Sequence, residues 1–104
     1  MKKLDQVTKQ LAKILREKLG EEIQGIILFG SRARGDFYED SDYDVIALVN
    51  KKTRVLRDKI RKLAWEVGWE NKALISIFVY KKTRFEKDRY EPLFMNVRKE
   101  GIPL

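Results

Sequence analysis

Residues 30–45 read GSRARGDFYEDSDYDV, and this charged stretch separates two apolar segments. Residues 26–29 form a short apolar run ahead of it, and residues 43–49, YDVIALV, are largely apolar and β-branched. Short apolar runs bounded by turn residues are typical of buried strands. The stretch therefore begins where one strand ends at Gly30 and runs into the start of the next strand.

Helices and one more strand are predicted around this pair. Apolar residues recur at helical spacing over residues 4–19, which predicts an amphipathic helix. Thr53 is a typical N-cap for a second such helix, which we expect to end near Gly68. Residues 73–80, ALISIFVY, then predict a third strand.

The C-terminal part predicts a last helix. Thr83 and Glu86 fit the spacing of a capping box, and Pro92 should break or restart the helix before Gly101. The expected order is helix, strand, loop or short helix, strand, helix, strand, helix. This order predicts an α+β fold with a small mixed three-stranded sheet flanked by helices. No linker or internal repeat interrupts it, so we expect a single domain over residues 1–104.

Composition narrows the possible chemistry. The chain has no cysteine and no histidine, which excludes disulfides, thiol chemistry, zinc sites with these ligands and histidine acid–base catalysis. Its formal charge of +7 favours phosphorylated or polyanionic partners, although a soluble surface rich in charged residues explains it equally well. No apolar run is long enough to span a membrane and the N-terminus lacks a secretory signal, so we expect a cytoplasmic protein.

Gly30 and Ser31 are candidates for binding phosphate. A glycine at the end of a strand lets a ligand approach the backbone closely, and the exposed N–H groups and the Ser31 hydroxyl can bind its oxygens. The nearby cations Arg32 and Arg34 suit the same ligand. A Gly-Ser pair taken alone is also compatible with a plain turn.

Asp42 and Asp44 are candidates for binding a metal. Side chains two positions apart in a strand lie on the same face, so two carboxylates there repel each other unless a cation lies between them. Oxygen ligands without histidine or cysteine suit Mg²⁺ or Mn²⁺. The alternative is a polar strand start in which the aspartates pair with arginines of the chain.

The combined pattern is more specific than either half. Gly-Ser, a spacer of ten residues and Asp-Tyr-Asp entering an apolar strand resemble the signature of the polymerase-beta-like nucleotidyltransferase superfamily. GSRARGD followed by SDYDV is similar to the minimal nucleotidyltransferases, the short stand-alone proteins of prokaryotes. The ending LFMNVRKEGIPL, residues 93–104, is similar to the tails of these proteins. The resemblance therefore covers nearly the whole chain, and it implies their fold.

The resemblance also implies roles for the residues of the motif. Gly30 and Ser31 would hold the β- and γ-phosphates of a nucleoside triphosphate, expected to be ATP, with Arg32 and Arg34 as phosphate clamps. Asp42 and Asp44 would bind divalent metals that bridge the phosphates. A hydroxyl would then attack the α-phosphorus, pyrophosphate would leave, and a nucleotide would be transferred. Asp36, in the same loop, is expected to cap or pair locally.

The chain departs from the family pattern at one position. Active members of the superfamily usually carry a third carboxylate on a later strand, where the segment ALISIFVY has no acid. Ser76 is its one polar interior residue and is expected at that position, while Glu70, just ahead of the strand, could substitute. The sequence therefore predicts either a nucleotidyltransferase or a nucleotide-binding module that acts by binding alone.

The resemblance implies a partner as well. Minimal nucleotidyltransferases often act as antitoxins beside a helical HEPN-type ribonuclease toxin, in some systems by attaching AMP to it. A homo-oligomer is the other source of the surface that so short a chain lacks. The basic run of residues 51–62 could contact RNA, but a solvated helix face is the favoured interpretation.

Three aromatic features have alternative interpretations. Trp65 and Trp69 are four residues apart and should share a helix face, where packing is favoured over a partner-binding ridge. Phe37 and Tyr38 could stack on a base or anchor the loop. Tyr43, between the two aspartates, should point to the opposite face of its strand and pack there.

Overall fold

The computed structural model describes residues 5–104, so the predicted helix start at Leu4 lies outside the described part of the chain. The elements follow one another as α1 (Gln6–Leu19), the 3-10 turn η1 (Gly20–Glu22), β1 (Ile23–Phe29), α2 (Ser31–Arg34), β2 (Tyr43–Val49), α3 (Arg54–Asn71), β3 (Ile75–Lys81), α4 (Lys82–Lys87), α5 (Pro92–Glu100) and β4 (Ile102–Pro103). No helix within residues 5–104 is long and apolar enough to cross a membrane.

The strands form one mixed sheet in the order β3-β2-β1-β4. β1 and β2 are antiparallel, β2 and β3 are parallel, and β4 runs antiparallel to β1 with Ile102 opposite Leu28. The predicted α+β class and mixed sheet are confirmed, but the count of three strands is wrong. The fourth strand has only two residues, one of them Pro103, and so short a segment has no alternating pattern that would reveal it.

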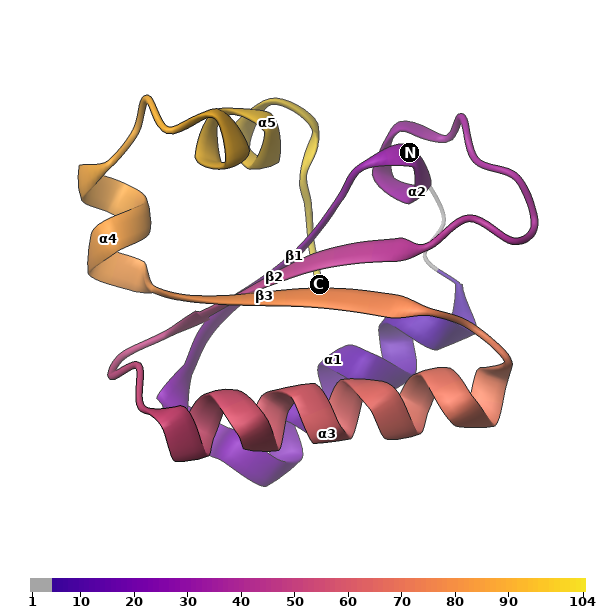
Figure 1. Ribbon diagram of the computed structural model, residues 1–104, viewed down its shortest axis with the longest axis horizontal. Coiled ribbons are helices and arrows are strands. Elements are labelled where there is room, and N and C mark those ends of the chain that lie inside the picture. The colour runs from indigo at the N-terminus through magenta and orange to yellow at the C-terminus, as the bar shows by residue number, and fades with distance from the viewer. Residues whose placement is uncertain (1–4) are drawn as a thin grey trace.

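The helices cover the sheet on both faces, with α1 and α3 on one and α4 and α5 on the other (Figure 1). Successive side chains of β2 alternate between two cores. Tyr43 and Val45 pack with α1 and α3, whereas Ile46 and Leu48 pack with Phe94 of α5. Asp44 lies on the face covered by α4 and α5, because it is two positions before Ile46 in the strand and residues two apart share a face. This alternation decides which residues of the motif can meet.

The long helix α3 begins as predicted but ends later. The Thr53 hydroxyl accepts a hydrogen bond from the Leu56 N–H at 3.1 Å, which confirms the N-cap. The helix continues past Gly68 and ends at Lys72, which takes a left-handed conformation with φ of 52°. Gly68 does not end the helix; it lets the backbone at Ala73 pack closely against the helix, because a Cβ there would lie 2.5 Å from the Ala73 carbonyl oxygen.

The C-terminal helices correct one expectation. Thr83 is not an N-cap, because β3 runs directly into α4 and the cap falls on Lys81, without a side-chain hydrogen bond. Pro92 occupies the first turn of α5, as the predicted restart requires. The capping-box pattern misplaced the start because strand and helix share no intervening loop that would mark the boundary.

Tyr43 ties β2 to the first helix. Its ring is buried on the face of α1 and α3, as predicted, and its hydroxyl donates to the carboxylate of Asp5, the N-cap of α1. Burial, together with this hydrogen bond, raises the pKa of Tyr43 to about 12. The residue between the two aspartates therefore fixes the start of β2 from the side opposite to Asp44.

The predicted packing role of the two tryptophans is wrong. Trp65 and Trp69 share a face of α3, but their side chains remain 64% and 74% exposed. Their rings stack on each other with centroids 5.7 Å apart and planes inclined by 17°. Helical spacing correctly placed them together, but the residues of α3 that pack into the core include Ile60, Ala64 and Val67, and the tryptophans lie outside this buried stripe.

Candidate functional site

The turn after β1 brings the two halves of the motif into contact. Gly30 has φ of 75°, which a residue with a side chain rarely adopts, and its carbonyl oxygen accepts from the Ala33 and Arg34 N–H groups at 3.1 and 3.0 Å. A Cβ on Gly30 would lie 2.4 Å from Oδ2 of Asp44. The turn that is expected to hold phosphate thus packs directly against a carboxylate that is expected to hold metal.

Asp44 lies in a setting that disfavours its own charge. Its side chain is half-buried at the start of β2, opposite Phe29 of β1. Burial raises the pKa of the Asp44 carboxyl, and so do the charges of Asp42 and Glu100, while Arg34 acts in the opposite direction. A cation bound between Asp42 and Asp44 would relieve this destabilisation. Asp42 itself is exposed at the end of the loop.

Ser76 occupies the strand position beside Asp44. The parallel register of β2 and β3 pairs the two residues directly, and paired side chains in neighbouring strands lie on the same face. Glu70 does not substitute for the missing acid: it lies in α3, on the other face of the sheet, and accepts a hydrogen bond from Gln10 at 2.7 Å. Residues 5–104 contain no group of three or more acids, histidines or cysteines that could hold a metal.

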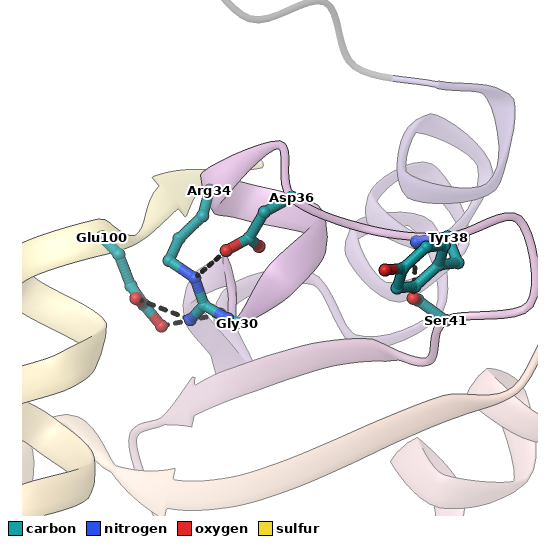
Figure 2. Close-up of polar contacts among 6 residues, drawn as sticks. All are labelled: Gly30, Arg34, Asp36, Tyr38, Ser41 and Glu100. Atoms are coloured by element: carbon teal, nitrogen blue, oxygen red, sulfur yellow. Dashed lines mark hydrogen bonds and ion pairs between the residues drawn. The ribbon is translucent and has the colours of Figure 1, made fainter.

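Arg34 is held near the turn by two acids. Its guanidinium pairs with Asp36 at 3.2 Å and with one oxygen of Glu100 at 2.9 Å, while the other Glu100 oxygen accepts from the Gly30 N–H at 2.9 Å (Figure 2). The predicted local pairing of Asp36 is confirmed. Burial would raise the pKa of Glu100, but the hydrogen bonds from Arg34 and Gly30 outweigh it and lower that pKa. Glu100 therefore fastens the end of α5 to the turn.

Arg32 points away from Asp44. Its guanidinium lies over the rings of Phe37 and Tyr43, 4.3 and 4.2 Å from their centroids, and donates to the carbonyl oxygens of Glu39 and Ser41. These contacts anchor the loop that leads to β2, and Phe37 takes part as an anchor. The two arginines predicted together as phosphate clamps thus lie on different sides of the motif, and only Arg34 lies by the turn and Asp44.

The hydroxyl of Ser31 has a less constrained setting. Ser31 is the first residue of α2 and is partly exposed, and its carbonyl oxygen accepts from the Gly35 N–H at 2.9 Å. The short helix therefore closes a tight turn in which the Ser31 side chain follows Gly30 directly. A role of this hydroxyl in binding phosphate stays a prediction.

The donors at this site fit a magnesium ion better in the company of a triphosphate than alone. The oxygens of Asp42 and Asp44 are hard ligands, and Mg²⁺ in proteins is commonly held by one or two carboxylates, phosphate oxygens and water. Burial and the charge of Asp42 raise the pKa of Asp44 although Arg34 lowers it, so a bound cation would stabilise the ionised carboxylate. Two carboxylates beside a glycine turn are a combination that suits such a shared ion.

Comparison with known proteins points to the same chemistry. A family model described as a nucleotidyltransferase domain matches residues 8–101. The chain is 39% identical over 79 residues to the "Putative protein adenylyltransferase MJ0141" of Methanocaldococcus jannaschii, which covers 75% of this chain and 80% of that protein.

Two solved structures have a similar fold. A toxin–antitoxin structure with AMP-PNP matches with a TM-score of 0.65 and 20% identity, over 91% of this chain and 69% of that one. The structure of a tri-AMPylated Shewanella oneidensis HEPN toxin with an MNT antitoxin matches with a TM-score of 0.54 and 17% identity, over 93% and 70% of the two chains.

Gly30→Ala should destabilise the protein by about 2–3 kcal/mol, because it adds strain at a positive φ to a clash with the Asp44 carboxylate. Chemical denaturation measures the free energy of unfolding. Gly25→Ala is the matched control, since a Cβ there meets Leu48 at an ordinary 3.4 Å.

The two causes separate in a double-mutant cycle. In an Asp44→Ala background the clash with the carboxylate is gone and only the Cβ of residue 44 remains close, at 3.3 Å, so Gly30→Ala should cost about 1 kcal/mol, mainly the backbone contribution. An equal cost in both backgrounds would show that the turn and the carboxylate do not press on each other.

Proposed function

The chain belongs to the nucleotidyltransferase domain family, and from this premise we propose that it transfers AMP from ATP to a hydroxyl group of a partner protein. The observation that carries the proposal is the contact between the Gly30 turn and the Asp44 carboxylate, because it would bring a backbone suited to phosphate and a carboxylate suited to metal to one point. The name of the M. jannaschii relative and the AMPylated toxin in the Shewanella structure support AMP as the transferred group.

The chain's own groups would bind and orient the triphosphate. Gly30 and Ser31 would line the β- and γ-phosphates, and Arg34 would neutralise their charge from a position that Glu100 and Asp36 already fix. Because the guanidinium is held by two carboxylates, little side-chain entropy is lost when the nucleotide binds. Arg32 would contribute indirectly, by holding the loop that ends at Asp42.

Asp42 and Asp44 would hold Mg²⁺ or Mn²⁺ together with the phosphates. The ion would supply neutralisation of the phosphate charge and would polarise the bond to the leaving group. In the transfer itself, the acceptor oxygen forms a bond to the α-phosphorus, the bond from that phosphorus to the bridging oxygen breaks, and pyrophosphate leaves with the electron pair. The acceptor proton goes to solvent, since Ser76 is a poor base beside Asp44.

The biological setting that we propose is a toxin–antitoxin pair. Two of the solved structures of similar fold are toxin–antitoxin complexes, one with AMP-PNP and one with an AMPylated HEPN toxin. On this proposal the chain is a cytoplasmic antitoxin that modifies a HEPN-type partner. One observation favours a second candidate, a module that neutralises its partner by binding alone: the position beside Asp44 carries the neutral Ser76.

Labelled ATP distinguishes the two candidates. With Mg²⁺ and a HEPN-type protein encoded in the same genome, the wild-type chain should transfer label to that protein. The double variant Asp42→Asn, Asp44→Asn should lose at least about 100-fold in rate, because the metal ligands are gone. Asp58→Asn with Glu66→Gln removes two exposed acids of α3, on the other face of the sheet, and should transfer label normally. Neutralisation of the toxin by the double variant, with no label moved by any chain, would contradict the enzymatic proposal.

Ser76→Asp tests the missing acid. The new carboxylate would lie beside Asp44 in the parallel register and should tighten Mg²⁺ binding in the presence of ATP, with a gain in the rate of transfer. Titration calorimetry measures the first effect and label transfer the second. Ser76→Asn has a similar volume without the charge and should give neither gain. Weaker Mg²⁺ binding by Ser76→Asp would show that the residue does not face the metal site.

A further inference from the structure

An apolar groove of about 870 Å³ lies between α3 and β3, outside the site described above. Trp65 and Trp69 of α3 line it, together with Leu74, just ahead of β3, and Ile75, its first residue. Leu74 is 63% exposed in addition to the two tryptophans, so three large apolar side chains meet solvent in one place. Exposed tryptophans beside a hollow are typical of the central residues of a protein–protein interface, and an exposed apolar patch of this kind often marks such an interface.

The same groove carries two cations without a partner. Arg61 and Lys72 line it, and within residues 5–104 neither side chain forms a hydrogen bond or an ion pair. The groove therefore suits a segment that offers an apolar or aromatic side chain together with two acids.

The chain itself contains such a segment at residues 38–40, Tyr-Glu-Asp. Tyr38 is 79% exposed, and the side chains of Glu39 and Asp40 have no partner within the described residues. Backbone contacts hold this tip in place: Tyr38 and Ser41 exchange hydrogen bonds of 2.9 and 3.0 Å (Figure 2). Arg32 binds the Glu39 and Ser41 carbonyl oxygens from within. The tip is thus ordered before any partner binds, which lowers the entropy cost of docking.

The tip and the groove are neighbours on one end of the molecule. The loop returns from the tip to Tyr43, whose N–H donates to the Leu74 carbonyl oxygen at 2.9 Å, and Leu74 lines the groove. Two complementary patches that lie side by side can meet the same patches of a second copy about a twofold axis. Each tip then enters the partner's groove, and the contact closes with two copies.

We propose that the groove of Trp65, Trp69, Leu74 and Ile75 receives the tip, residues 38–40, of a second copy of this chain. Tyr38 packs against the tryptophans, and Glu39 and Asp40 pair with Arg61 and Lys72. The result is a twofold-symmetric dimer. The net charge of +7 does not prevent this contact, because repulsion between distant charges is screened over about 8 Å at physiological salt, while the contacting charges are opposite.

Charge reversal tests the pairing in both directions. In sedimentation experiments without nucleotide, the wild type should form a dimer as its concentration rises. Arg61→Glu with Lys72→Glu, and separately Glu39→Lys with Asp40→Lys, should each raise the dissociation constant at least about tenfold, because symmetry makes every reversal count twice. Mixing the two variants should restore dimers, since each tip then faces a groove of opposite charge. Lys81→Glu with Lys87→Glu is the control, at the far end of β3 and on α4, and should dimerise normally.

The tryptophans give a second reading. They are the only two in the chain, so their fluorescence should change as the wild type dimerises, and in either charge-reversed variant this change should need a protein concentration at least about tenfold higher. A wild type that stays monomeric at all concentrations overturns the proposal, as does a mixture of the two variants that stays monomeric. Assemblies of more than two copies would overturn the twofold pairing.

Binding of an acidic protein or of RNA to the groove of a wild type that does not dimerise would assign the surface to that partner instead. None of these readings requires ATP turnover, so they stand apart from the enzymatic proposal.

Discussion

The approach of Gly30 to Asp44 is the constraint on which the rest of the motif depends. The backbone turns at a positive φ and lies so close to the carboxylate that no side chain fits between them. The antiparallel pairing of Phe29 with Asp44 sets this contact, because it places the end of β1 beside the start of β2. A glycine followed by a serine at the end of a strand is thereby linked to an acid fourteen positions later, and the two become one site.

Because side chains alternate along β2, the residues that hold the loop in place and the residues around Asp44 lie on opposite faces of the sheet. On one face, Tyr43 and Arg32 fasten the loop to the core of α1 and α3. On the other face, Arg34 and Glu100 surround the turn beside Asp44. At the start of β2, a residue that packs in the core, Tyr43, therefore lies between two candidate metal ligands, Asp42 and Asp44. A single-residue shift of the strand register would exchange their surroundings.

The sequence sufficed for the parts of this arrangement that are local. The turn at Gly30, the position of the two aspartates and the packing of Tyr43 follow from strand periodicity and residue type, and Ser76 follows from being the one polar residue inside the third strand. Glu100 could not be found in this way, since it reaches Arg34 across 66 positions and no spacing rule connects them. Likewise, Arg32 and Arg34 have the same chemistry in sequence, and only the turn of α2 separates their directions. The exposure of Trp65 and Trp69 depends on which face of α3 meets the core, which the spacing of the two residues alone does not show.

The linkage between Mg²⁺ and nucleotide tests most directly whether the Gly30 turn and the two aspartates form one site. Calorimetry with a non-hydrolysable ATP analogue measures Mg²⁺ affinity with and without the nucleotide. If the phosphates and the carboxylates share the ion, Mg²⁺ should bind at least about tenfold more tightly in the presence of the analogue, and the analogue should gain by the same factor from Mg²⁺. The free analogue also binds Mg²⁺, so the measured affinities are corrected for that binding. A corrected Mg²⁺ affinity that is equal with and without the analogue would contradict the shared site.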